Sequence, residues 1–181
     1  MKTLRPCLSV LAVLLAGALI GCSNTTKTAD VSGSVRKSLE QAGFKDVSTS
    51  DDRDKGVVTL GGHVATDGEK AQAESIAASQ AAGQVVSNQI AVIPPGAEHD
   101  AKVMNSDLDK GIAQNLDAAL IQDRLHEGVN YTVKNHVVTL TGNVDSQDAR
   151  ARAQQVAASV PNVQQVVNEL QIKDLKASSS N

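Results

Sequence analysis

Two similar stretches decide the fold. Residues 56–64 read Gly-Val-Val-Thr-Leu-Gly-Gly-His-Val, and residues 136–144 read His-Val-Val-Thr-Leu-Thr-Gly-Asn-Val. The Ala-rich segments that follow them, and then Val86/Asn88 and Val166/Asn168, align at the same offset of about 80 residues without a gap. An internal repeat of this kind indicates two copies of one structural unit.

Each copy has the same order of patterned segments. Short β-branched or apolar runs predict strands, and apolar residues spaced by three or four predict amphipathic helices. In the first unit we expect a helix from Asp30 that ends at Gly43, a strand at 47–50, a charged hairpin loop at 51–56, the central strand at 56–64, a helix at 68–82 capped by Asp67, and a strand at 85–93.

The second unit follows the same order. We expect a helix at 106–126, a strand at 129–133, a tight turn at Lys134-Asn135, the central strand at 137–144, a helix at 147–160 capped by Ser146, and a strand at 165–173. The chain then divides into a signal peptide (1–21), a tether (22–29), the first domain (30–93), a linker (94–105), the second domain (106–173) and a tail (174–181).

The order α-β-β-α-β predicts the topology of each unit. A hairpin joins antiparallel strands, whereas a strand reached through a helix returns parallel by a right-handed crossover. We therefore predict an α+β fold with a three-stranded mixed sheet and two helices on one face. The other face must be polar, dock the partner domain or bind a ligand.

The N-terminus has the pattern of a secretory signal. Lys2 and Arg5 precede an apolar run that is too short to cross a membrane and ends at Cys22 in the sequence Leu-Ile-Gly-Cys. This ending resembles a bacterial lipobox, which implies that Cys22 is lipidated and becomes the first mature residue. Ser23 after it favours transport to the outer membrane, facing the periplasm. An ordinary signal peptide with a chance cysteine is the alternative.

Charge and composition argue against nucleic acid as a partner. Without Lys2 and Arg5 the chain has 15 basic and 20 acidic residues, a net charge of −5. Phe44 and Tyr131 are the only aromatic residues, so base-stacking platforms cannot be built.

The sequence shows no pattern of a catalytic or cofactor site. There is no phosphate loop, nucleophile elbow or His-Glu-x-x-His motif, and His63, His99, His126 and His136 lack the spacing of metal ligands. We expect no enzyme activity, no cofactor and no metal.

Basic residues of the second unit are candidates for contact with lipid. Lys134, His136, Arg150 and Arg152 could meet anionic headgroups, each contributing about 1 kcal/mol near such a surface. The alternative is that Arg150 and Arg152 only make an exposed helix face soluble.

Four repeated residues are candidate structural positions. Gly62 and Gly142 suggest a bulge or a close approach of backbone in the central strands, by packing or by a ligand. Asn88 and Asn168 recur in the last strands, where an amide would tie backbone at a sheet edge or turn.

The repeated motif, with the Ala-rich helix and Val-x-Asn-x-Ile/Leu after it, resembles the BON domain family. Matching residues are 56–64 and 86–90 in the first unit, and 136–144 and 166–170 in the second. Two-domain members of this family include outer-membrane lipoproteins. The resemblance implies an envelope protein that binds anionic phospholipid, mainly through the second domain, and that associates with envelope proteins.

These observations give two functional hypotheses. In the first, a lipid-anchored envelope protein binds phospholipid surface through its BON domains and supports envelope integrity or stress tolerance. In the second, the domains form a periplasmic protein-interaction or chaperone-like module without specific lipid binding. A spacer role within the periplasm is a third reading.

Overall fold

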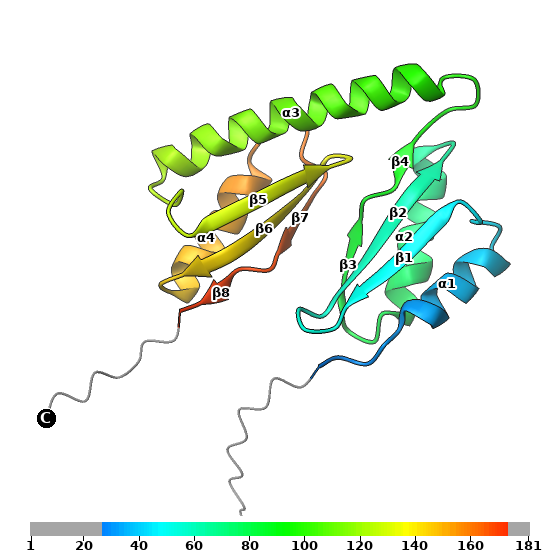
Figure 1. Cartoon of the computed structure of the whole chain (residues 1–181), viewed down its shortest axis with the longest axis horizontal. Coiled ribbons are helices and arrows are strands. Elements are labelled where there is room, and N and C mark those ends of the chain that lie inside the picture. The colour runs from blue at the N-terminus through cyan, green and yellow to red at the C-terminus, as the bar shows by residue number, and fades with distance from the viewer. Residues whose placement is uncertain (1–26, 174–181) are drawn as a thin grey trace, which may run out of the picture.

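The two repeats form two α+β domains, each built on its central strand (Figure 1). The structure is a computed structural model, and it describes residues 27–173. The elements of the first domain are α1 (Ser32–Gln41), β1 (Val47–Asp52), β2 (Val57–Val64), α2 (Asp67–Gln80), β3 (Val85–Asn88) and β4 (Ala91–Val92). The elements of the second are α3 (Glu98–Gln122), β5 (Val129–Lys134), β6 (Val137–Val144), α4 (Gln147–Ala158), β7 (Gln165–Asn168) and β8 (Gln171–Ile172).

The sheet topology confirms the prediction. The central strand β2 pairs antiparallel with β1 and parallel with β3 and β4, and β6 repeats this arrangement with β5, β7 and β8. Alternate residues of each central strand, such as Val58 and Leu60, are buried under the two helices of their domain. Both helices therefore cover the same face of the sheet.

We predicted one continuous last strand in each domain, at 85–93 and 165–173. In the structure, each of these strands is broken after an asparagine. Asn88 Oδ1 accepts the N–H of Ile90 (3.3 Å), and its Nδ2 donates to Lys70 O (3.2 Å) on α2. Asn168 makes the equivalent bonds to Leu170 and Arg150. These side chains satisfy backbone groups where the ladder is interrupted.

Helix α3 begins at Glu98, eight residues before the predicted helix start at Ser106, so residues 98–105 of the predicted linker (94–105) are helical. The buried residues of α3 are Ile112, Leu116 and Leu120, all in its second half. The first turns of α3 contribute no residue to a buried stripe, and the sequence there showed no clear helical period. Pro94, Pro95 and Gly96 do end the preceding strand.

The N-cap of α2 is Thr66 and not Asp67. Thr66 Oγ1 accepts the N–H of Glu69 (3.2 Å), and the Glu69 carboxylate accepts the N–H of Thr66 (3.1 Å). This reciprocal pair is a capping box, and it moves the helix start one residue toward the N-terminus. Ser146 caps α4 as predicted, by accepting the N–H of Ala149 (3.1 Å).

Gly62 and Gly142 mark positions where another backbone comes too close for a side chain. Gly62 has φ +91°, and a Cβ there would lie 2.0 Å from Asp46 O; Gly142 has φ +114°, with a Cβ 2.3 Å from Gly128 O. Both conditions favour glycine alone. Packing of the protein's own backbone accounts for these two residues.

We predict that Gly142→Ala lowers the free energy of unfolding by about 1–3 kcal/mol, because the new Cβ adds a clash to a strained φ. Urea unfolding measures the change. The matched control is Gly111→Ala in α3, where a Cβ meets nothing within 4 Å. That variant should be stabilised by up to about 1 kcal/mol. Equal stability of the two variants would contradict this account of Gly142.

Candidate functional site

The N-terminal segment 27–31 is fastened to the β1–β2 hairpin. Thr28 N–H donates to Arg53 O (3.0 Å) and Arg53 Nε donates to Thr28 O (2.9 Å), so the two residues bind each other reciprocally. Val31 N–H donates to Asp51 Oδ2 (3.0 Å). The predicted tether (22–29) therefore lies partly within the folded domain. Cys22, the predicted lipidation site, lies outside the described residues.

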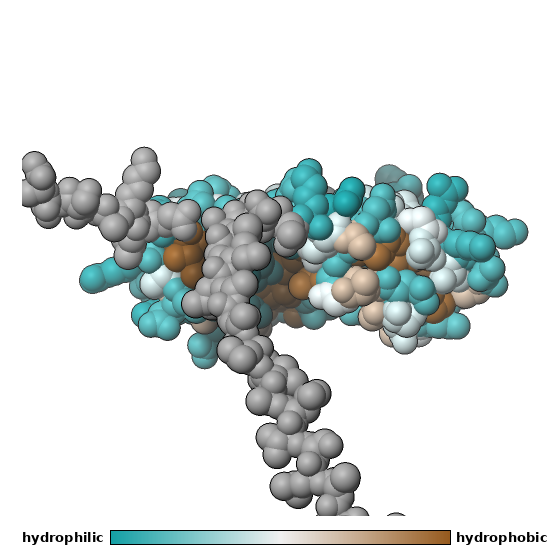
Figure 2. Space-filling model, turned by 90° about the horizontal axis from the view of Figure 1, so that it is seen from below, coloured by the Kyte–Doolittle hydropathy of each residue, from teal (hydrophilic) through white to brown (hydrophobic). Residues whose placement is uncertain are grey.

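This attachment defines one side of the molecule, which we call the tether side. It contains Lys27 and the β1–β2 hairpin, and β3 begins and β8 ends there (Figure 1). Val85, the first residue of β3, is 50% exposed, and Ile172, the last of β8, is 44% exposed. Figure 2 looks onto this side and shows hydrophobic side chains among hydrophilic ones.

The basic residues predicted for lipid contact do not form one patch. Lys134 is exposed at the end of β5, and His136 lies in the following two-residue turn. Asn135 and His136 have φ of +48° and +67°, which is the type I′ hairpin geometry. The Asp109 carboxylate accepts the N–H of Asn135 and of His136, each at 2.8 Å. This turn is thus tied to α3.

Arg150 and Arg152 lie on different sides of α4. Arg150 is half-buried and donates through Nη2 to Asn168 O (3.2 Å) at the break between β7 and β8. Arg152 is exposed and pairs with Asp123 just after α3, with Nε 3.2 Å from Oδ1. Each guanidinium already has a partner within the second domain. The structure therefore does not bring Lys134, His136, Arg150 and Arg152 together as a shared anion site.

The two domains meet along β3 and β7, in an interface that we call the seam. Val57, Val137 and Val167 form a small apolar cluster there, and each is at most 4% exposed. They come from the sheet faces that carry no helices. Near β3 and β7 the open face therefore docks the partner domain, which is one of the three roles predicted for it.

The side chain of Gln165 joins the two sheets. Its Oε1 accepts the N–H of Asn88 (2.8 Å), and its Nε2 donates to Val86 O (2.6 Å). These are the backbone groups on the free edge of β3. One carboxamide thus replaces the peptide group of a neighbouring strand and covers an edge that could otherwise pair with another chain.

Polar contacts flank the Gln165 bridge at both ends. Lys55 Nζ lies 2.7 Å from the buried Glu169 carboxylate, and this hydrogen bond raises the pKa of Lys55. Asn135 Nδ2 donates to Gln89 O (2.7 Å) at the other end. Because these two pairs occupy equivalent places in the two repeats, the seam is an approximate two-fold interface.

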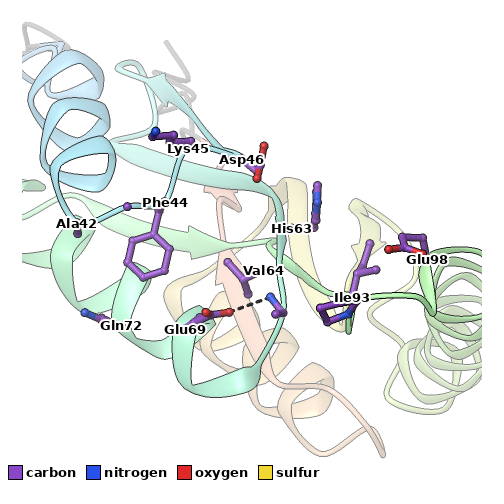
Figure 3. A pocket seen from close by; sticks show the side chains of 13 residues that line it. Ala42, Phe44, Lys45, Asp46, His63, Val64, Glu69, Gln72, Ile93 and Glu98 are labelled. Carbon is purple, nitrogen blue, oxygen red and sulfur yellow. Dashed lines mark hydrogen bonds between the residues drawn. The ribbon is translucent and has the colours of Figure 1, made fainter.

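A recess of mixed character lies beside α2, where the first domain meets the start of α3 (Figure 3). Its volume is about 430 Å³, with Phe44, Val64 and Ile93 among its apolar residues. Glu69 caps α2, and Glu98 Oε1 accepts the N–H of Gly96 (3.0 Å). Backbone N–H groups of Glu98 and Gly96 lower the pKa of Glu98. Both carboxylates therefore bind backbone N–H groups of their own helix starts.

Residues 27–173 contain neither a cluster of metal ligands nor a membrane-spanning helix. This part of the chain has no group of three or more His, Cys, Asp or Glu side chains that could hold a metal ion. Over the same residues, none of the helices combines the length and the apolar character needed to cross a bilayer. The described residues define the class of the protein by its architecture: two repeated α+β domains that meet along β3 and β7.

The family comparison agrees with this class. The BON domain model matches residues 27–94 and 108–174, which together are most of the chain. The chain belongs to the BON domain family. BON domains are in general membrane-associated modules of cell-envelope proteins, and this is the general class of the chain.

The other comparisons add little. No curated protein matched the chain. Among solved structures, it is similar to CdsD, a structural protein of the type III secretion system of Chlamydia trachomatis, with 13% identity, a TM-score of 0.35, and coverage of 80% of this chain and 92% of that one. A structure of the C-terminal domain of CdsD matches with 12% identity, a TM-score of 0.34, and coverage of 81% and 99%. TM-scores this low support no conclusion about the fold or the function of this chain.

We predict that Gln165→Ala weakens the seam by about 1–3 kcal/mol, because two hydrogen bonds are lost and the Asn88 N–H loses its partner. Urea unfolding should show a lower free energy, or a second transition if the domains separate. Gln171→Ala, an exposed position in β8, is the control and should behave as the parent protein. If Gln165→Ala were as stable as this control, the claim that the Gln165 side chain stabilises the seam would be contradicted.

Proposed function

We propose that the protein is a lipid-anchored envelope protein with a binding role and no catalytic one, whose tether side contacts the phospholipid surface that holds the lipid of Cys22. The observation that carries the proposal is the attachment of residues 27–31 to the β1–β2 hairpin. It supports a defined orientation of the domains on a membrane.

The reach of the tether limits that orientation. Only residues 23–27 lie between the lipidated position and Thr28, the first residue with a backbone hydrogen bond to the hairpin. Five residues span at most about 18 Å when fully extended. Acyl chains on Cys22 would bind a bilayer stably, because each buried methylene contributes about 0.8 kcal/mol. The hairpin side would then stay near the headgroups.

The tether side has residues suited to weak contact with lipid. Val85 and Ile172 are exposed apolar side chains. Lys173 follows Ile172 in the chain, and Arg53 and Lys55 in the hairpin carry positive charge beside the carboxylates of Asp52 and Asp54. Lys173 is paired with Asp145 at the surface (2.9 Å), where both side chains are exposed. Such pairs contribute little and leave the lysine available to a headgroup. The proposal places lipid contact here and not on Arg150 and Arg152.

Co-sedimentation with vesicles tests the proposal. The mature chain with Cys22→Ser should bind anionic vesicles at low salt and zwitterionic vesicles more weakly. Val85→Ser/Ile172→Ser should reduce binding about tenfold, because two half-exposed apolar side chains are lost. The matched control, Val103→Ser/Met104→Ser on α3, should leave it unchanged.

Two results would overturn the proposal. Failure to bind anionic vesicles at low salt would exclude a lipid-binding surface, since surface electrostatics are strongest in that condition. Loss of binding in the α3 variant alone would place the lipid contact on the other side of the molecule.

A further inference from the structure

The first turns of α3 expose an apolar surface that packs on neither domain core. Val103 is 48% exposed and Met104 is 64% exposed, although both are large apolar residues in an ordered helix. With Leu108 they line a shallow, open hollow whose lining residues all belong to this one helix. We call these three residues the α3 patch. A cluster of exposed apolar side chains on one helix face is typical of an interaction site.

The α3 patch continues a helix whose second half is packed into the second domain. Asp109 accepts two hydrogen bonds from the β5–β6 turn, and Ile112 begins the buried stripe one turn later. The fold thus fixes the helix while its patch faces solvent. Because the patch residues are already helical, a partner that binds them does not have to order their backbone.

The α3 patch lies away from the tether side. Lys27 and the start of α3 are on opposite sides of the molecule in Figure 1. This step rests on the proposed function, because it takes the tether side as the one that faces the anchoring bilayer. The anchoring membrane would then not reach the patch, which would point toward the periplasm.

Acidic side chains accompany the apolar ones. Asp100 and Asp107 line the same hollow, and Glu98 begins the helix. Lys110 pairs with Asp107 (2.9 Å), but both side chains are about two-thirds exposed, so this pair contributes little. An anionic headgroup would meet two carboxylates at this place. The charge complements a partner with basic side chains.

We propose that the α3 patch docks a segment of another protein in which apolar side chains are flanked by Lys or Arg. The apolar residues enter the hollow beside Val103, Met104 and Leu108, and the basic ones pair with Asp100 and Asp107. Met104 suits such a role because its flexible thioether adapts to different apolar shapes.

Fluorescence anisotropy with a defined probe tests the proposal. The probe is a labelled amphipathic helical peptide of Leu and Lys, about 14 residues long, and its counterpart has Glu in place of Lys. The mature chain with Cys22→Ser should bind the Leu/Lys peptide and not the Leu/Glu peptide. Val103→Ser/Met104→Ser should weaken binding about tenfold, and Asp100→Asn/Asp107→Asn about fivefold with a smaller salt dependence.

A charge-matched control separates local contact from net charge. Glu127→Gln/Asp148→Asn removes two exposed carboxylates far along the chain from the patch and should leave the affinity unchanged. Equal affinity of the parent protein and the Val103/Met104 variant would overturn the proposal, as would equal losses in the two charge variants.

Vesicle binding by the same variants distinguishes the two proposals. If Val103→Ser/Met104→Ser lowers binding to anionic vesicles but not to the peptide, α3 is a lipid surface and the docking proposal fails. If the peptide binds at the α3 patch and neither the parent protein nor any variant binds vesicles, the docking proposal stands and the proposed lipid contact fails.

Discussion

The carboxamide of Gln165 is the contact on which the arrangement of the two domains depends. It fills the hydrogen-bonding positions of Val86 and Asn88 on the edge of β3, and so fixes β7 beside that strand. The valine cluster beneath it and the Lys55–Glu169 pair add apolar burial and charge to the same seam. Because one side chain replaces a strand, the two sheets lie side by side without merging into one.

This arrangement gives the molecule two different surfaces, to which the two proposals assign different contacts. The hydrogen bonds between Thr28 and Arg53 place the start of the folded chain at the β1–β2 hairpin. The seam fixes the position of the second domain relative to the first. Helix α3 then extends on the side away from the hairpin, with Val103 and Met104 exposed. A lipid on Cys22 would therefore do more than retain the protein, since it would also determine which surface remains open to partners.

Local sequence signals predicted most of each domain and little of their contact. The repeat identified the central strands, and apolar spacing located the buried faces of α1, α2 and α4. The breaks after Asn88 and Asn168 were missed because apolar residues continue on both sides of them. The early start of α3 was missed because its first turns bury no apolar stripe. The scattering of Arg150 and Arg152, and the Gln165 bridge, depend on tertiary packing that no local pattern contains.

Site-specific labelling of the lipidated protein on vesicles tests the orientation most directly. In the mature chain that the proposal assumes, residues 22–181, Cys22 is the only cysteine, so Asp54→Cys in the hairpin and Met104→Cys in α3 each provide a single labelling position. Quenching of the attached fluorophore by spin-labelled lipid headgroups reports its distance from the bilayer. The account predicts strong quenching at position 54 and little at position 104. Equal quenching at both positions, or stronger quenching at 104, would contradict it.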